Sequence, residues 1–288
     1  GIVTLMCMAI GIAGTRRRLK TIEESEAEKS DGAPGPALGD AFMQFISAYR
    51  ITPNVIRLFV LVFLVLVTLS SINQLTLHLS TYLWKLESAH NQWLMIAGQL
   101  GTLTGVIAAV RLMKSMEQRR VLTWGLIGFF ACALLSILVP LSGEGPSAAS
   151  AQMAWFVSIC RFIGGIAYGS YLGPLGGVIL VIGDEHEVNT GRPQQGFVSA
   201  VHFVGLQAAS GVVGLLAGLF LDLIAFPVGV TPDQMPAEKI SSLGLFVSAV
   251  IGVASALLIV VIRTLDISRE KQQAIGKQLV SLRLGGRQ

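Results

Sequence analysis

Six long apolar stretches are the feature that most constrains this 288-residue chain. Each approaches or exceeds the roughly 20 residues that a helix needs to cross a bilayer. A soluble protein would have to bury all six, although helices of globular domains usually have only about 8 to 20 residues. The sequence therefore predicts an all-α, polytopic membrane protein with a six-helix transmembrane bundle over residues 54–264. The stretches cover residues 58–82, 93–110, 121–141, 153–182, 197–226 and 242–262.

The positions of lysine and arginine predict the orientation of these helices. Loops rich in the two residues stay in the cytoplasm, and alternating spans bring most of them to one side, whereas the other side holds Lys85 and Lys239 among acidic residues. We therefore expect an integral protein, in a bacterial inner membrane, whose tail at residues 265–288 is cytoplasmic. The net charge of +4 then reflects topology and requires no nucleic-acid partner.

The first residues differ from a signal peptide. Residues 1–14 are apolar and are followed by Arg16, Arg17 and Arg18, whereas a signal peptide has its cations before its apolar core. We expect residues 1–14 to be the end of a preceding transmembrane helix of a larger protein. Residues 15–53 are predicted to be a cytoplasmic loop, because much of the segment is too polar to form a core. Its second part has helical spacing, which indicates a short amphipathic helix on the membrane surface or a regulatory element.

Polar side chains inside the apolar stretches are the candidates for a solute pathway, because such groups at membrane depth usually face a cavity or a partner. Arg161 stands out, since it lies about two turns inside the fourth stretch. It could equally reach the outer headgroups or brace a neighbouring helix. The spread of polar residues over four stretches favours a polar cavity. The candidate pathway residues are Asn73, Gln74, Gln99, Arg161, Tyr168, Tyr171, His202 and Gln207.

Glycines recur along two of the stretches and predict close helix contacts. In the fourth stretch they follow one another at four-residue intervals, and such a stripe lets another helix backbone approach closely. Static packing explains this stripe, and so does a helix that slides or rocks. The predicted packing residues are Gly165, Gly169, Gly173 and Gly177 in the fourth stretch, and Gly214 and Gly218 in the fifth.

The chain carries no signature of an enzyme. The stretches hold no paired carboxylates, no HExxH and no Ser/His/Asp set, and no Walker loop is present. Cys7, Cys132 and Cys160 lie in apolar segments without paired spacing, so we expect free thiols and neither a disulfide nor a metal site. The acidic residues at 184–187 are more typical of a solvated or gating loop than of a metal site. We expect no cofactor.

The segment after the fourth stretch, GDEHEVNTGRPQQG at residues 183–196, resembles a motif of the glycoside-pentoside-hexuronide:cation symporters. This melibiose-permease-like family belongs to the major facilitator superfamily. Its pattern is an Asp, an acidic residue three positions later, Thr-Gly, a basic segment and a Gly that opens the next helix. The resemblance implies that the six stretches correspond to helices seven to twelve of a transporter, and that Asp184, Glu187 and Arg192 help to close a cytoplasmic gate.

The resemblance further implies a secondary transporter in which two six-helix halves rock about a solute. The expected partners are the lipid bilayer, a small-molecule solute and an N-terminal half in the same or another chain. Coupling to Na⁺ or H⁺ would depend on carboxylates in that half. Where the family has an Asp and a basic pair, this chain has Val181, Pro193 and Gln194. The solute therefore stays open between a sugar and an amphipathic, lipid-like molecule.

A second hypothesis does not involve transport. A six-helix membrane subunit could scaffold or assemble a larger complex and use the glycine stripes as docking faces. The missing charged residues of the family favour this hypothesis, whereas the acidic gate segment and the polar pathway residues favour transport. An enzyme acting within the membrane is a distant third.

Overall fold

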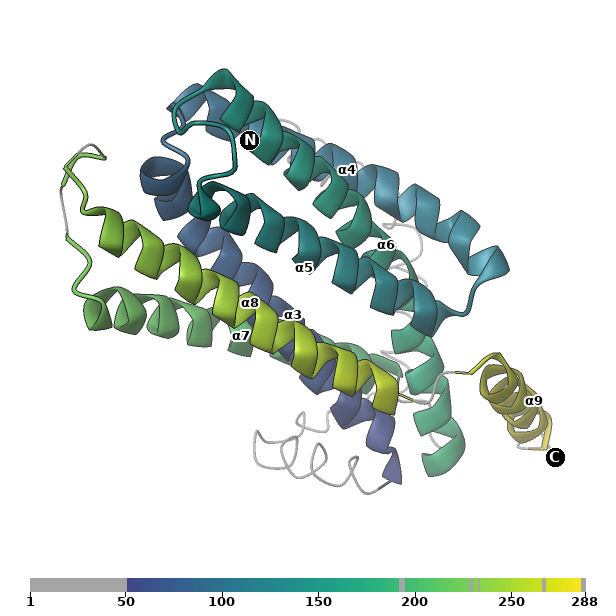
Figure 1. The fold of residues 1–288 in the computed structure, drawn as a ribbon. Helices are drawn as coiled ribbons and strands as arrows, with labels where there is room; N and C mark the ends of the chain where they lie inside the picture. The colour runs from purple at the N-terminus through teal and green to yellow at the C-terminus, as the bar shows by residue number, and fades with distance from the viewer. Residues whose placement is uncertain (1–50, 192–194, 228–229, 233, 266–267, 286–288) are drawn as a thin grey trace, which may run out of the picture. The chain divides into compact units, whose positions relative to one another are not determined.

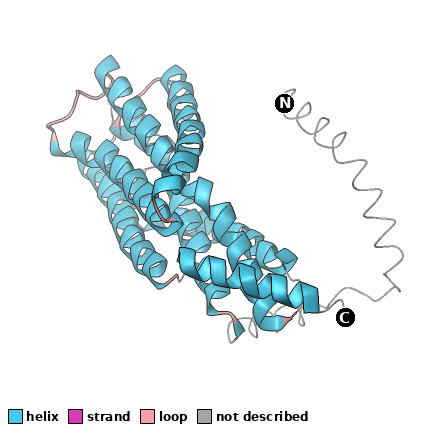
Figure 2. Cartoon of the chain, turned by 90° about the vertical axis from the view of Figure 1, so that its right-hand side faces the viewer, coloured by secondary structure: helices cyan, strands magenta, loops and turns pink. Residues whose placement is uncertain are grey.

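The computed structural model describes residues 51–285 apart from 192–194, 228–229, 233 and 266–267. The predictions for residues 1–14, for almost all of the loop at 15–53, for Cys7 and for Arg192 lie outside the described residues. Within them the regular secondary structure is helical, without strands (Figure 2). This confirms the all-α prediction for that part of the chain.

Six helices are long and apolar enough to cross a membrane, as predicted. A shorter helix follows them (Figure 1). The first span continues beyond its α-helix as one π-helical segment, η1. The elements are α3 (Pro53–His78), η1 (Leu79–Leu83), α4 (Ser88–Ser115), α5 (Gln118–Ser142), α6 (Ala151–Thr190), α7 (Gln195–Leu223), α8 (Ala237–Thr264) and α9 (Arg269–Gly285).

Helix α6 is longer than its apolar stretch. The sequence motif after Ile182 indicates a loop, but the helix continues for two further turns to Thr190. It ends at Gly191, whose φ of 70° is readily adopted by glycine and is typical of a helix C-terminus. The added turns are stabilised by packing, because the side chains of His186 and Glu187 are buried there. The acidic segment is therefore a helix end rather than a loop.

The helices pack in a ring with one helix outside it. Around the ring, α6 packs against α5, α5 against α8, α8 against α3, α3 against α7, and α7 against α6. Helix α4 packs mainly against α6. In the most apolar segment of each span, 22% of the residues of α4 and 24% of those of α7 are buried, compared with 44% in α6. Helices α4 and α7 therefore present the largest uncovered surfaces.

Glycines allow α4 and α6 to approach backbone to backbone. A methyl group added at Gly169 would lie 2.8 Å from the backbone nitrogen of Val106, and one at Gly165 would lie 3.0 Å from that of Thr102. Real side chains do not approach as closely as the first distance, and the methyl group at Gly165 would also collide with the Gly98 carbonyl oxygen. A methyl group at Gly173 would lie 2.5 Å from the Ala109 Cβ. The stripe on α6 thus lies against α4.

The other predicted packing glycines have different surroundings. A methyl group added at Gly177 would lie 3.1 Å from the side-chain nitrogen of Gln118, which belongs to α5. At Gly214 and Gly218 an added methyl group would meet no described atom within 4 Å. These two glycines therefore pack against none of the described residues, and their packing role remains a prediction for a partner on the uncovered face of α7.

A buried tryptophan joins η1 to α5 at one end of the bundle. Trp84 is only 1% exposed, and its indole N–H donates to the Ser136 carbonyl at 2.9 Å. Its own carbonyl accepts from the backbone N–H of Ala149 at 3.0 Å, just before α6. Ser150 then caps α6 by accepting from the Met153 N–H at 3.1 Å. The connections at this end are therefore tied to the core.

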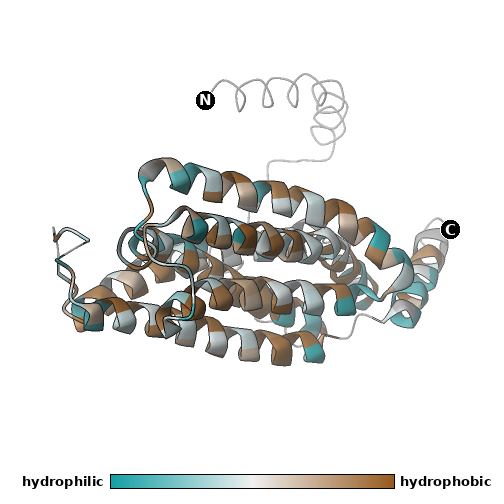
Figure 3. Ribbon diagram, turned by 45° about the horizontal axis from the view of Figure 1, so that its top comes forward, coloured by the Kyte–Doolittle hydropathy of each residue, from teal (hydrophilic) through white to brown (hydrophobic). Residues whose placement is uncertain are grey.

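The outer surface suits a lipid environment. Large apolar side chains such as Met95, Leu103 and Leu223 are more than half exposed, and Figure 3 shows apolar residues along the helices with many hydrophilic residues near their ends. Trp93 and Trp155 are exposed near one end of the bundle. Tryptophan is enriched at membrane interfaces, so these positions are those expected of a membrane-spanning bundle.

Substitution of a stripe glycine by alanine tests the α4–α6 contact. Gly169→Ala should lower the thermal unfolding temperature, because overpacking typically costs about 1–3 kcal/mol. Gly176→Ala is the matched control, since an added methyl group there meets open space on the same helix. Differential scanning fluorimetry of the purified protein gives the comparison, and equal unfolding temperatures for the two variants would contradict the close contact.

The buried indole can be tested in the same way. Trp84→Phe should destabilise the protein by at least about 1 kcal/mol, because the Ser136 carbonyl loses a hydrogen bond in a buried position. Trp93→Phe, at a side chain that is 65% exposed, should leave the unfolding temperature nearly unchanged. A Trp84→Phe variant as stable as wild type would show that the hydrogen bond does not stabilise this end.

Candidate functional site

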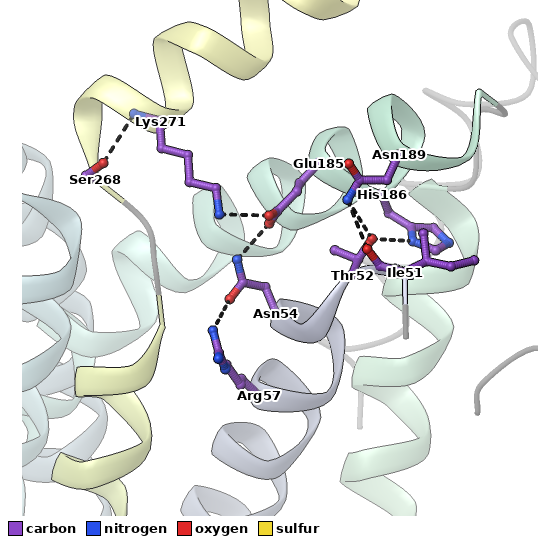
Figure 4. Close-up of polar contacts among 9 residues, drawn as sticks. All are labelled: Ile51, Thr52, Asn54, Arg57, Glu185, His186, Asn189, Ser268 and Lys271. Atoms are coloured by element: carbon purple, nitrogen blue, oxygen red, sulfur yellow. Dashed lines mark hydrogen bonds and ion pairs between the residues drawn. The ribbon is translucent and has the colours of Figure 1, made fainter. Parts of the chain in front are cut away.

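Two groups of polar residues lie at different depths of the bundle. The first lies where α3 begins, α6 ends and α9 begins, which we call the α9 end (Figure 4). The Glu185 carboxylate joins all three helices there. One of its oxygens accepts from Asn54 Nδ2 at 2.7 Å, and the other pairs with Lys271 Nζ at 2.8 Å. Arg57 Nη1 donates to the side-chain oxygen of Asn54 at 3.1 Å, which orients that amide.

A second set of bonds at the α9 end surrounds a buried histidine. His186 is 2% exposed, and its Nδ1 lies 3.0 Å from the Thr52 hydroxyl oxygen. Asn189 Nδ2 donates to the same oxygen at 3.1 Å and to the Ile51 carbonyl at 3.3 Å. The Thr52 hydroxyl thus bonds to both His186 and Asn189 of α6. The bonds fasten the start of α3 to the last turns of α6.

Helix α9 is held by polar bonds near its start and by buried apolar side chains further along. The Lys271 backbone N–H donates to the Ser268 hydroxyl at 3.2 Å, which caps the helix. Gln272 Nε2 donates to the side-chain oxygen of Gln118 at the start of α5, at 3.1 Å. Ile275 and Leu279 are buried, so α9 packs with its apolar side and adds polar bonds to two other helices.

The predicted gate residues lie in or beside this group. Asp184 is half-buried and Glu187 is buried on the last turns of α6, and their gating role stays a prediction. Glu185 and His186 were not among the residues predicted from the sequence to form the gate, and their partners lie more than 80 residues away along the chain. Helical spacing could have indicated a shared partner, because Glu185 and Asn189 are four residues apart and lie on one face of the helix.

The second group contains Arg161, about 15 Å along the axis from the start of α6. Its Nη2 donates to the Thr76 hydroxyl oxygen of α3 at 2.6 Å. Thr76 donates its own proton to the Ile72 carbonyl at 2.5 Å, so its oxygen is left to accept from the guanidinium. No acidic side chain among the described residues forms an ion pair with Arg161. Since a central arginine costs roughly 2.5 to 3.5 kcal/mol on insertion scales, this lone charge is a costly feature.

Most of the other candidate pathway residues are exposed or half-buried, on α3, α4 and α7. Asn73 and Gln74 are exposed on α3, and Asn73 is three residues from Thr76 and therefore its neighbour on the helix surface. Gln99 on α4 and Gln207 on α7 are exposed at other positions. His202 is half-buried on α7, where its ring lies edge-on to that of Phe203 with the centroids 5.7 Å apart. The structure thus joins Arg161 with α3 through the Thr76 hydroxyl, and the contact of Gln99, His202 and Gln207 with a solute stays a prediction.

The two predicted tyrosines lie where α5 and α6 pack together. The Tyr168 ring is 5.3 Å from that of Phe129 and 5.9 Å from that of Tyr171, centroid to centroid. Tyr171 is 2% exposed. Both rings therefore contribute to helix packing, and their contact with a solute stays a prediction.

Metal-ligating side chains do not gather in the part of the chain that the structure describes. There, no group of three or more His, Cys, Asp or Glu residues could hold a metal ion. Cys132 and Cys160 are free thiols.

Comparison with known proteins adds to this geometry. A family model for MFS/sugar transport proteins matches residues 2–269. A comparison with curated proteins found no matching sequence. Because the family match covers most of the chain, and six of the described helices can span a membrane, the chain belongs to the MFS/sugar transport protein family of the major facilitator superfamily.

Proposed function

We propose that this chain contributes six helices to a secondary active transporter that works by alternating access. The exposed amides of Asn73, Gln74, Gln99 and Gln207 carry the proposal. They lie on membrane-length helices whose other exposed residues are mostly apolar. Lipid does not hydrogen-bond such groups, and intramembrane polar groups usually face a cavity or a partner. These helices are the expected lining of a solute pathway that a second six-helix half completes.

The charge distribution supports a cytoplasmic location for the α9 end. Eight of the described cations lie there or on the neighbouring helix ends, whereas Lys85 and Lys239 lie at the other end. By the positive-inside rule this end stays in the cytoplasm, in a bacterial inner membrane on our proposal. The eight cations are Arg57, Arg111, Lys114, Arg119, Arg120, Arg263, Lys271 and Lys277.

Coupling to a Na⁺ or H⁺ gradient is part of the proposal. In the sequence, the six apolar stretches contain one acidic residue, Asp222, near the end of the fifth. Carboxylates that bind the coupling ion are therefore expected in the other half of the transporter. The solute is a sugar, as the family description suggests, or an amphipathic, lipid-like molecule.

A scaffolding subunit is the competing function, and one observation favours it. Gly214 and Gly218 form a smooth, uncovered face on α7, which another membrane protein could contact closely. The same face would also suit the other half of a transporter.

Uptake into proteoliposomes tests the proposed function. The full-length gene product should accumulate at least one solute from a panel of sugars and lysolipids when a Na⁺ or proton gradient is imposed. Collapse of the gradient with an ionophore should abolish accumulation, because transport against a concentration difference requires a coupling ion. Absence of uptake by protein shown to be folded would instead support the scaffolding subunit.

The Glu185–Lys271 pair offers a test of the proposed inner gate. Glu185→Gln should make trypsin cleave after Lys277 about five times faster, because loss of a partly buried ion pair costs about 1 kcal/mol and opens α9 correspondingly more often. Glu144→Gln, which removes an exposed carboxylate at the other end, is the control. Equal cleavage rates for Glu185→Gln and wild type would show that the pair does not hold α9.

A further inference from the structure

We infer that the solute carries an anionic group, a carboxylate or phosphate, which the Arg161 guanidinium binds with the help of polar side chains of α3. The inference rests on the proposed transport function and concerns the same pathway. It starts from a charge that the described helices do not neutralise. Arg161 donates to a neutral hydroxyl, that of Thr76, and pairs with no acid among the described residues.

The arrangement leaves donors available for a ligand. A guanidinium has five N–H groups in a planar fork that matches two oxygens of a carboxylate or phosphate. The bond from Nη2 to Thr76 orients the fork and uses one of these groups. The Arg161 side chain keeps part of its surface exposed in the described bundle. A solute can therefore reach it, while the low-dielectric surroundings strengthen a charge-assisted bond.

A purely structural brace would not need the charge. A glutamine could donate to Thr76 equally well and would cost less to insert into the membrane. The acid in the six apolar stretches, Asp222, is exposed near the end of α7 and forms no ion pair with Arg161. An arginine at this depth is explained if the anionic group that pairs with it belongs to the solute.

The neighbouring amides indicate what else the solute contains. Asn73 lies about one turn before Thr76 on α3, and Gln74 follows Asn73 directly in the sequence. Residues three apart on a helix are neighbours, so the exposed Asn73 shares a helix face with Thr76, which binds Arg161. An amide both donates and accepts, which suits hydroxyl groups. The site therefore fits an anion that also carries hydroxyls better than a neutral sugar.

Ligand-induced stabilisation of the purified full-length protein tests the inference without requiring transport. The probes are pairs that differ in charge: methyl glucuronide against methyl glucoside, glucose 6-phosphate against glucose, and lysophosphatidate against monoacylglycerol. A ligand that binds the folded state raises the unfolding temperature with increasing concentration. At least one charged member should do so, and its neutral counterpart should do so only weakly. The pair that responds distinguishes a sugar from a lipid-like source of the anion.

Variants assign the effect to the guanidinium. Arg161→Gln should weaken binding of the charged probe by about ten- to hundredfold, the range expected for loss of charge-assisted hydrogen bonds. Arg161→Lys should bind with intermediate affinity, because it keeps the charge but loses the fork. Arg120→Gln, at an exposed position on α5, should bind like wild type. If Arg161→Gln does not fold, the test uses two other variants. Arg161→Lys should bind the charged probe with intermediate affinity, and Thr76→Val should bind it more weakly than wild type.

Other outcomes would overturn the inference. It fails if no charged probe stabilises the protein, if neutral probes stabilise it equally, or if Arg161→Gln binds the charged probe like wild type. It also fails if Arg161→Gln lowers stability without any probe and leaves probe binding intact, since Arg161 would then pair with an acid of the other half. Arg161-dependent binding without uptake of any solute would retain the anion site and reject the transport function.

Discussion

The close contact between α4 and α6 is the interaction on which the rest of the arrangement depends. Glycines remove the side chains that would separate the two backbones, and methyl groups at Gly165 or Gly169 would collide with α4. In a bilayer, where lipid tails are as apolar as leucine, such packing is a principal source of helix association. The contact holds α6 along much of its length, and α6 carries both polar groups described above.

Helix α6 links these two groups mechanically. Arg161 and Glu185 lie on one continuous helix, about 36 Å apart along its axis. Arg161 contacts α3 in the membrane-spanning part, and Glu185 contacts α3 and α9 at the α9 end. Any tilt of α6 against α4 would displace both contacts together. In the proposed transporter, solute binding near Arg161 could therefore change the contacts of Glu185 that close the α9 end, because both residues move with α6.

The two charged groups are stabilised in different ways. Glu185 is satisfied within the described residues, since Asn54 and Lys271 each bind one of its oxygens. Arg161 donates to a neutral hydroxyl and forms no ion pair with an acid among the described residues. The first arrangement is what a stable helix junction requires. The second is costly at membrane depth, and such costs are typical of functional positions.

Hydropathy alone predicted the six membrane-length helices of the described residues, because the required length of apolar sequence follows from bilayer thickness. It also identified Arg161, since a cation in an apolar stretch is visible without a structure. The glycine stripe of α6 indicated a close contact but could not identify α4 as its partner. The extension of α6 to Thr190 was missed, because its polar turns have the composition of a loop and become helical through packing.

What only the tertiary structure decided is which residues meet. Thr76 and Arg161 are 85 positions apart, and Asn54 and Glu185 are 131 apart. Periodicity specifies the face of one helix and carries no information about the helix opposite. The same limit applies to Tyr168 and Tyr171, which lie in the α5–α6 contact, and to Gly214, which faces open space. Sequence determines membrane insertion because that depends on each segment separately, whereas a site depends on contacts between segments that only the packed bundle brings together.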